Sequence, residues 1–304
     1  MMKGKDLPPL PTLPSAELII CLLDCSESMT EEDFHDPDRG GKTTRGQGVA
    51  DVFNYLLARL AGSSVGEQFL INVTLFAGEA KIHDELTFSA DGSVKPYIPW
   101  AHARRLVKHH GIRGSSPEEK ASKETLDKIK DILSNEGLLI EDTTKLKKKI
   151  GIEEGTDISG ALAKAREICQ QFMSDDWWIL PPEAKRKTSV ILLTDGEPTI
   201  NEGQEEGEAM RLKNLGARVI TIGIGEEVAR TDKFKNLLYS CASAVPSGIL
   251  AQPILGTGMM LRDILYRPPS GGGYRFCVIV EKLTPELIQA LRAFLWSISG
   301  GART

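Results

Sequence analysis

The sequence has few cysteines, and their arrangement does not indicate a disulfide framework. The 304 residues include an odd number of them at scattered positions: Cys21, Cys25, Cys169, Cys241 and Cys277. Small secreted domains that depend on disulfides are much richer in cysteine. Two of the five fall among apolar residues, where free thiols are commonly buried. We therefore expect free thiols and a reducing compartment, the cytoplasm.

Long hydrophobic runs are also missing. The run Leu18-Ile19-Ile20-Cys21-Leu22-Leu23 stops at Asp24, whereas a membrane-spanning helix needs about 20 apolar residues. No signal-peptide cleavage site follows this run, and no later segment is longer. With 41% hydrophobic and 26% charged residues, the chain has the composition of a soluble globular protein with a sizeable core. We expect no membrane partner.

The chain has no excess of positive charge and few aromatic residues. It carries 37 basic and 42 acidic residues, a net charge of −5, and only 6% are aromatic. Nucleic-acid binders usually show basic patches and stacking motifs, so we expect no nucleic-acid partner. A Gly-Lys-Ser/Thr phosphate loop is absent as well, which excludes that class of nucleotide-binding site.

Short apolar runs alternate with segments of helical periodicity. The runs 17–23, 69–76, 188–194 and 218–224 are typical of buried parallel strands. Apolar residues at helical spacing predict helices over 44–61 and 157–172, and a polar helix is expected at 203–215. This order predicts an α/β fold: a doubly wound, Rossmann-like, mostly parallel sheet with helices on both faces. Residues 80–88 are predicted to form one antiparallel edge strand, and residues 89–100, which contain Asp91-Gly92, Pro96 and Pro99, are predicted to be a loop.

Composition shifts divide the chain into three parts. Residues 1–15 are rich in proline and are expected to be a flexible lead. Residues 16–266 are predicted to form one domain, interrupted by a charged, helical insertion at about 90–152. A run of proline and glycine at 267–273 indicates a linker, and 267–304 is predicted to be a strand–helix extension packed on the same domain.

Acidic and hydroxyl side chains follow the predicted strands. Asp24 and Asp195 each end a buried run, and the carboxyl ends of parallel strands are where ligands bind in such sheets. Ser26 and Ser28 alternate with Asp24, so an extended backbone would present all three on one side. Thr156 precedes the helix at 157–172 and could also cap it. These oxygen donors predict a site for Mg²⁺ or Mn²⁺.

The donor types also predict how such a cation would behave. Hydroxyls are neutral donors, so much of the cation's charge would remain uncompensated and would attract an external acidic ligand. Each motif has a simpler interpretation when taken alone: capping hydroxyls at 24–28, a helix cap at 156–157 and a turn at 194–198. The occurrence of all three at strand and helix ends favours a metal site.

Three motifs carry a resemblance to a known family. Asp24-Cys25-Ser26-Glu27-Ser28, then Gly155-Thr156-Asp157, then Thr194-Asp195-Gly196-Glu197-Pro198-Thr199 resemble the von Willebrand factor A domain family over roughly 16–266. The resemblance implies a metal-ion-dependent adhesion site made by Asp24, Ser26, Ser28, Thr156 and Asp195. It also implies that the metal binds an Asp or Glu of a partner protein without catalysis. The third motif is similar to intracellular bacterial members in tellurite-resistance-type and AAA+ ATPase-associated gene clusters, which implies an adaptor or scaffold.

The sequence departs from the family pattern at three places. Glu27 replaces a usual glycine, an acidic loop follows at 30–42, and the insertion at 90–152 enters next to the site. Two other functions stay open: a metal-dependent phosphohydrolase using Asp24 or Glu27, and a scaffold with a purely structural metal. Phosphotransferases that use such an aspartate usually carry a second one two residues later, where this chain has Ser26. We therefore expect a binding module and no enzyme.

Overall fold

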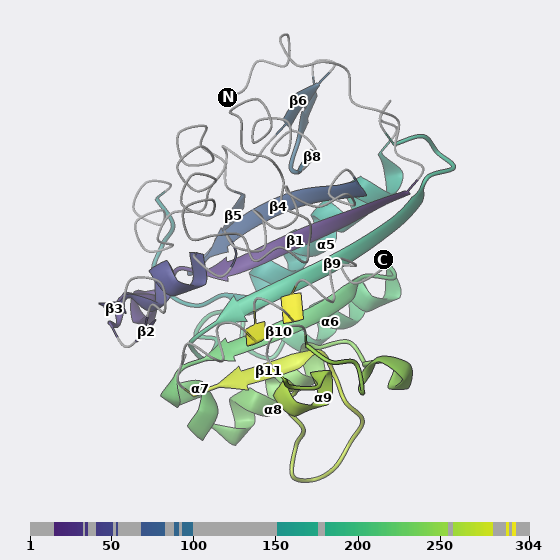
Figure 1. Cartoon of the computed structure of the whole chain (residues 1–304). Coiled ribbons are helices and arrows are strands. Elements are labelled where there is room, and N and C mark those ends of the chain that lie inside the picture. Colours follow the sequence, from purple (N-terminus) through teal and green to yellow (C-terminus); the bar gives the residue numbers. More distant parts are fainter. Residues whose placement is uncertain are drawn as a thin grey trace.

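A central twisted sheet organises the molecule (Figure 1). The computed structural model describes residues 15–32, 34–35, 41–50, 53, 68–82, 88–90, 93–99, 151–175, 180–254, 258–281, 290–291 and 294–295. The strands of the sheet are β1 Ser15–Asp24, β4 Phe69–Phe76, β5 Ala80–Ile82, β8 Ile98–Pro99, β9 Lys185–Thr194, β10 Arg218–Ile224 and β11 Cys277–Val280. Their order is β11-β10-β9-β1-β4-β5, and β8 also pairs with β4.

The pairing confirms the predicted fold class. All neighbours from β11 to β4 run parallel, and β5 joins β4 in the antiparallel direction at the edge. Alternate side chains of β1 enter two different cores. Leu18, Ile20 and Leu22 face one hydrophobic cluster, whereas Ile19 and its alternating neighbours face the other. Burial on both faces explains why the strand sequences are apolar almost throughout.

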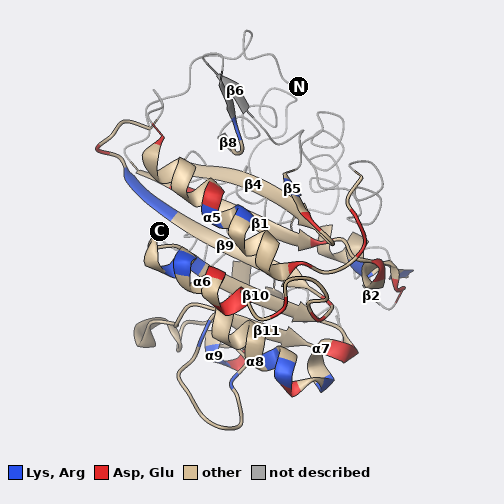
Figure 2. Cartoon of the chain, turned by 180° about the vertical axis from the view of Figure 1, so that it is seen from behind, with Lys and Arg blue, Asp and Glu red and all other residues tan. Residues whose placement is uncertain are grey.

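Helices cover both faces of the sheet. The helices are α5 Ile158–Ser174, α6 Glu205–Asn214, α7 Glu226–Arg230, α8 Asp232–Cys241 and α9 Leu261–Ile264, with 3-10 helices η1 Glu27–Thr30 and η4 Ser247–Ile249. Figure 2 shows α5, α6 and α8 side by side on one face. Helical residues at 45–50, 290–291 and 294–295 contribute to the core on the opposite face. The layered arrangement is that of a doubly wound sheet.

Local signals define the ends of α5 and α6. Asp157, and not Thr156, caps α5, because its carboxylate accepts a 2.8 Å hydrogen bond from the Gly160 N–H. Gly216, which follows the C-cap residue Leu215 of α6, adopts a φ of 83°, as the glycine signal predicts for a helix end.

The edge of the sheet differs from the prediction for residues 89–100, which we expected to be a loop. The segment contributes to β6 Phe88–Ala90, which pairs with β7 Ser93–Lys95, and it contains β8. The loop prediction is therefore wrong for these residues. Pro99 lacks an N–H donor, yet an edge strand tolerates proline.

The C-terminal segment contributes to the same sheet. β11 follows the glycine-rich run and pairs with β10 through four residue pairs, Thr221 to Ile224 against Cys277 to Val280. The division at 266/267 stays a prediction. The predicted lead up to residue 14 and most of the predicted helical insertion, 101–150, lie outside the described residues. In the part of the chain that the structure describes, no helix is long and apolar enough to cross a membrane.

Candidate metal site

The candidate site lies at the carboxyl edge of the two central strands. β1 and β9 are parallel neighbours with Leu23 opposite Leu193, so both strands end at the same place. Asp24 is the last residue of β1, and Asp195 directly follows β9. Both aspartates are 0% exposed. The sheet therefore brings together two carboxylates that are 171 residues apart in sequence.

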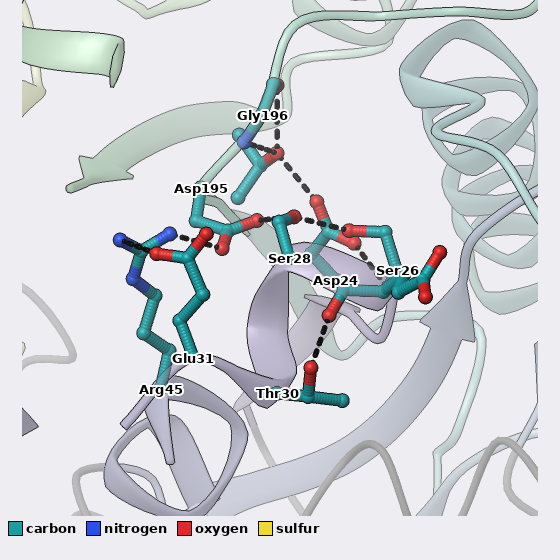
Figure 3. A network of polar contacts seen from close by, with 10 residues as sticks. Asp24, Ser26, Ser28, Thr30, Glu31, Arg45, Asp195 and Gly196 are labelled. Carbon is teal, nitrogen blue, oxygen red and sulfur yellow. Dashed lines mark hydrogen bonds and ion pairs between the residues drawn. The ribbon is translucent and has the colours of Figure 1, made fainter. Parts of the chain in front are cut away.

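A chain of hydrogen bonds links the two serines to Asp195 (Figure 3). The Ser28 hydroxyl donates to Asp195 Oδ1 at 2.7 Å, and the oxygens of Ser26 and Ser28 lie 3.1 Å apart. Because the Ser28 proton is directed to Asp195, the Ser26 hydroxyl is the donor between the serines. Ser28 lies in η1, so the expected extended backbone over 24–28 is wrong. A 3-10 turn after Ser26 brings these groups together instead.

Asp24 is held by two donors of its own. Its Oδ1 accepts the Ser26 N–H at 2.8 Å, and its Oδ2 accepts the Thr194 hydroxyl at 2.6 Å. Thr194 is the last residue of β9 and also lies 3.2 Å from the Gly196 carbonyl. Both Asp24 oxygens are thus fixed by protein donors before any cation is considered.

Thr156 approaches the same place from the turn before α5. A Cβ added at Gly196 would lie 3.7 Å from Ser28 Oγ and 3.9 Å from Thr156 Oγ1, so both hydroxyls border one small space. The backbone of Thr156 is tied to the loop after β9 by two bonds with Thr199, at 2.9 and 3.0 Å. The structure therefore brings all five sequence-predicted residues to one edge. Their role as metal ligands stays a prediction.

Arg45 is a member of the site that the sequence analysis missed. Its Nη1 donates to Asp195 Oδ2 at 2.9 Å, and the whole residue is 6% exposed. Arg45 begins the helical residues 45–50, after Thr44, whose hydroxyl accepts the Gln47 N–H at 3.1 Å. A basic residue at a helix N-terminus is disfavoured by the helix dipole. This unfavourable position of Arg45 was the signal in the sequence that an acidic residue lies close to it in the fold.

Glu31 completes the polar network on its outer side. Its carboxylate lies 2.5 Å from Arg45 Nη2, and its side chain is 59% exposed. Glu27 is exposed at the start of η1, close in sequence to the serines. The acidic loop at 30–42 is closed by β2 Phe34–His35 and β3 Lys42–Thr43, while residues 33 and 36–40 lie outside the described part.

Burial makes the ionised form of both aspartates unfavourable. It raises the pKa of Asp24 to about 7, and the nearby charge of Asp195 adds to the rise. Burial also raises the pKa of Asp195, against the opposing effect of hydrogen bonds from Ser28 and Arg45. Two buried carboxylates with one guanidinium form a place where a further cation would be stabilised.

The donor set fits a hard divalent cation. The groups that border the space are carboxylate and hydroxyl oxygens, the donors that Mg²⁺ and Mn²⁺ prefer. Both carboxylates already accept hydrogen bonds, whereas Ser26 Oγ, as a donor to Ser28, keeps lone pairs for a cation. Among the described residues, no three or more His, Cys, Asp or Glu side chains form a group that could hold a metal ion by themselves. The serine and threonine hydroxyls are therefore essential to this donor set.

Comparisons with known proteins found matches among solved structures. No protein-family model and no curated protein matches the chain. Proximal thread matrix protein 1 from the mussel byssus matches with 16% identity over 95% of this chain and 48% of its own, at a TM-score of 0.46. The same mussel protein with a zinc-occupied MIDAS motif matches with 17% identity over 95% and 48%, at 0.45. BatB from Bacteroides thetaiotaomicron matches with 16% identity over 95% and 100%, also at 0.45.

This chain spans about half of the mussel protein, with 48% of that chain covered. The resemblance of this chain to a known family therefore rests on its own motifs and sheet topology. Asp24, Thr156 and Asp195 belong to three motifs that lie at one edge of a mostly parallel sheet with an antiparallel border. In the order of these motifs and in this architecture, the chain resembles the von Willebrand factor A domain family.

Proposed function

We propose that this chain is a metal-dependent protein-interaction module. Ser26, Ser28 and Thr156 would hold one Mg²⁺ or Mn²⁺, with Asp24 and Asp195 supplying the compensating negative charge. The ion, when bound, supplies a positive centre with a coordination position for an outside carboxylate. The partner is a protein that offers an Asp or Glu to this position.

One observation carries the proposal: the hydrogen-bonded chain from Ser26 through the half-buried Ser28 to Asp195, next to the buried Asp24. Neutral hydroxyls border the space, and the carboxylates behind them are held by protein donors. A dication placed there keeps part of its charge uncompensated, which favours a further anionic ligand. Such a site is suited to binding an acid from another molecule.

The protein's own residues prepare the site for that ligand. Thr194 and the Ser26 N–H fix both oxygens of Asp24, and Ser28 and Arg45 fix both oxygens of Asp195. Carboxylates that are already fixed do not need to reorganise when the partner's acid binds. Both Asp24 oxygens accept hydrogen bonds that hold the side chain in place. No observation specifically favours a nucleophilic or basic role for Asp24, as the phosphohydrolase would require. We propose a binding role and no enzymatic activity.

The setting is proposed to be a cytoplasmic, bacterial multiprotein system in which the chain is an adaptor or scaffold. Its five cysteines are all free and buried, which suits a reducing compartment.

A peptide-display selection tests the proposal. The full chain is immobilised with Mn²⁺, displayed peptides are bound, and retained peptides are eluted with EDTA. We expect enrichment of Asp- or Glu-containing peptides on the wild type and none on S26A. S189A is the matched control, because Ser189 is also buried on the sheet but binds Glu17, at 2.8 Å, away from the site.

Two results would contradict the proposal. One is retention of the same peptides on S26A as on S189A. The other is retention that survives EDTA, which would mean that the metal, if bound, has only a structural role.

A further inference from the structure

The buried Arg45 guanidinium joins the proposed metal site to an exposed acid. It contacts Asp195 on one side, at 2.9 Å, and Glu31 on the other, at 2.5 Å. Its side chain is 7% exposed, that of Asp195 is 0% and that of Glu31 is 59%. Charge therefore changes from fully buried to exposed along one short line of three side chains (Figure 3).

The backbone fixes Arg45 in this position. Its N–H donates to the Glu31 carbonyl at 3.0 Å, so main chain and side chain join the same two residues. The turn after β10 closes over the guanidinium: Gly225 has a φ of 108°, and a Cβ added there would lie 3.3 Å from Arg45 Cζ. Because Arg45 is buried, water screens its charge less than it screens the charge of an exposed residue.

The sum of the buried charges shows what Arg45 does. Asp24 and Asp195 contribute −2 when ionised, and Arg45 reduces this to −1. A bound dication then makes the buried group +1, whereas without Arg45 the same group would be neutral. A net positive group attracts a carboxylate; a neutral group holds its metal more tightly and attracts an outside acid less.

We propose that Arg45 is the residue that sets this balance, weakening the hold on the metal and strengthening the hold on the partner's carboxylate. The inference rests on the proposed function. Arg45 is thus a specificity-determining residue that touches neither the partner nor the cation directly. Glu31 offsets part of the Arg45 charge from the exposed side. Removing the Glu31 charge should therefore change both affinities in the opposite direction from removing the Arg45 charge, and by a smaller factor.

Two titrations measure the two affinities separately. Mn²⁺ alone is titrated into the metal-free full chain by calorimetry. Acetate is then titrated into the Mn²⁺-loaded chain and followed by water-proton relaxation, which falls when a carboxylate displaces metal-bound water. The variants are R45Q, which keeps one donor toward Asp195, and E31Q. R166Q is the control, because Arg166 forms a 2.9 Å ion pair with Glu208 away from the site.

We expect R45Q to bind Mn²⁺ on the order of tenfold more tightly and acetate severalfold more weakly. E31Q should bind Mn²⁺ about twofold more weakly and acetate about twofold more tightly, since exposed charges are screened. R166Q should match the wild type in both titrations. Thermal melts in EDTA establish whether each variant folds. If R45Q does not fold, the Mn²⁺ and acetate affinities of E31Q alone test the inference.

Affinities that move in the same direction, or do not move, in R45Q and E31Q overturn the role of Arg45. If the wild type itself binds Mn²⁺ no better than S26A does, both the proposed function and this inference fail. A wild type that binds both probes, with variants that bind them equally well, overturns this inference alone.

Discussion

The two ends of the sheet both bury carboxylates, but they satisfy them differently. At the amino end, Asp175 accepts hydrogen bonds from Lys95 Nζ and the Tyr97 hydroxyl, and its side chain is 8% exposed. Arg186 lies beside it, with guanidinium bonds to the carbonyls of Phe172 and Asp175. The Asp175 carboxylate thus contacts one cation and one hydroxyl directly, and a second cation, Arg186, binds the backbone carbonyls at the C-terminus of α5.

At the carboxyl end of the sheet, buried acidic groups outnumber basic groups. Two buried carboxylates stand beside one guanidinium: Arg45 pairs with Asp195 and with the exposed Glu31, whereas Asp24 accepts hydrogen bonds from the neutral Ser26 N–H and Thr194 hydroxyl. Acidic residues also follow the loops at this end, whereas β9 begins with basic residues (Figure 2). The comparison teaches that burial of a carboxylate is not itself a sign of function. An excess of buried acid over base distinguishes a place that can accept a further cation from one that only stabilises the fold.

Substitution at the amino end should have the largest effect on stability. D175A leaves Lys95, whose side chain is 12% exposed, without its carboxylate. Breaking a buried ion pair on one side costs about 3–5 kcal/mol, and urea unfolding should show this loss equally in Mg²⁺ and in EDTA. E167A, in the exposed pair with Lys164, is the control and should cost less than about 1 kcal/mol. A loss in D175A that depends on Mg²⁺ would break the distinction between the two ends.

The free energy of unfolding of the metal-free chain should depend on pH, because buried acid exceeds buried base at the carboxyl end of the sheet. Because the pKa of Asp24 is raised to about 7, its contribution to the free energy of unfolding is present below about pH 4 and lost up to about pH 7. Relative to D24N, the wild type in EDTA should lose roughly 2–4 kcal/mol over this interval and change little above it. Urea unfolding of both proteins at matched pH measures the difference. A difference that is flat or rises with pH would contradict the charge balance at this end.

Metal should stabilise the chain only through the carboxyl end. At a Mn²⁺ concentration 100 times the dissociation constant, the free energy of unfolding should rise by about 2.7 kcal/mol in the wild type and in S189A. S26A and S28A should show little of this gain. Equal stabilisation of S26A and S189A would place the metal elsewhere.

The smallest change is a single methyl group at the site. In G196A the new Cβ would lie 3.7 Å from Ser28 Oγ and 3.9 Å from Thr156 Oγ1, which is ordinary contact distance. We expect a melting temperature in EDTA within a few degrees of the wild type, together with Mn²⁺ binding weakened severalfold because the space is partly filled. Calorimetry measures the affinity. Unchanged binding would show that the cation does not lie between these two hydroxyls.

Much of the fold follows from short-range sequence signals. The limits of β4 and β10 agree with the predicted runs 69–76 and 218–224, because buried strands leave no choice of face. The edge was harder to predict. Pro99 and the Asp91-Gly92 pair obscured β6 to β8, since edge strands are short and tolerate residues that end other strands.

The site shows the same division between local and long-range signals. Asp24, Thr156 and Asp195 could be placed at one edge because the topology of such a sheet brings the carboxyl ends of the strands and the start of the predicted helix together. Arg45 could not, because its role depends on a contact with Asp195, 150 residues away. Sequence spacing reveals which groups an element offers, but not which distant charge balances them.

Diffraction from crystals of the full chain soaked in Mn²⁺, recorded at the manganese absorption edge, tests the central claim most directly. The account predicts one anomalous peak about 2 Å from the hydroxyl oxygens of Ser26, Ser28 and Thr156, with Asp24 and Asp195 close behind and Arg45 still on Asp195. A space between these hydroxyls without a peak at millimolar Mn²⁺, while the metal binds elsewhere or not at all, would contradict it.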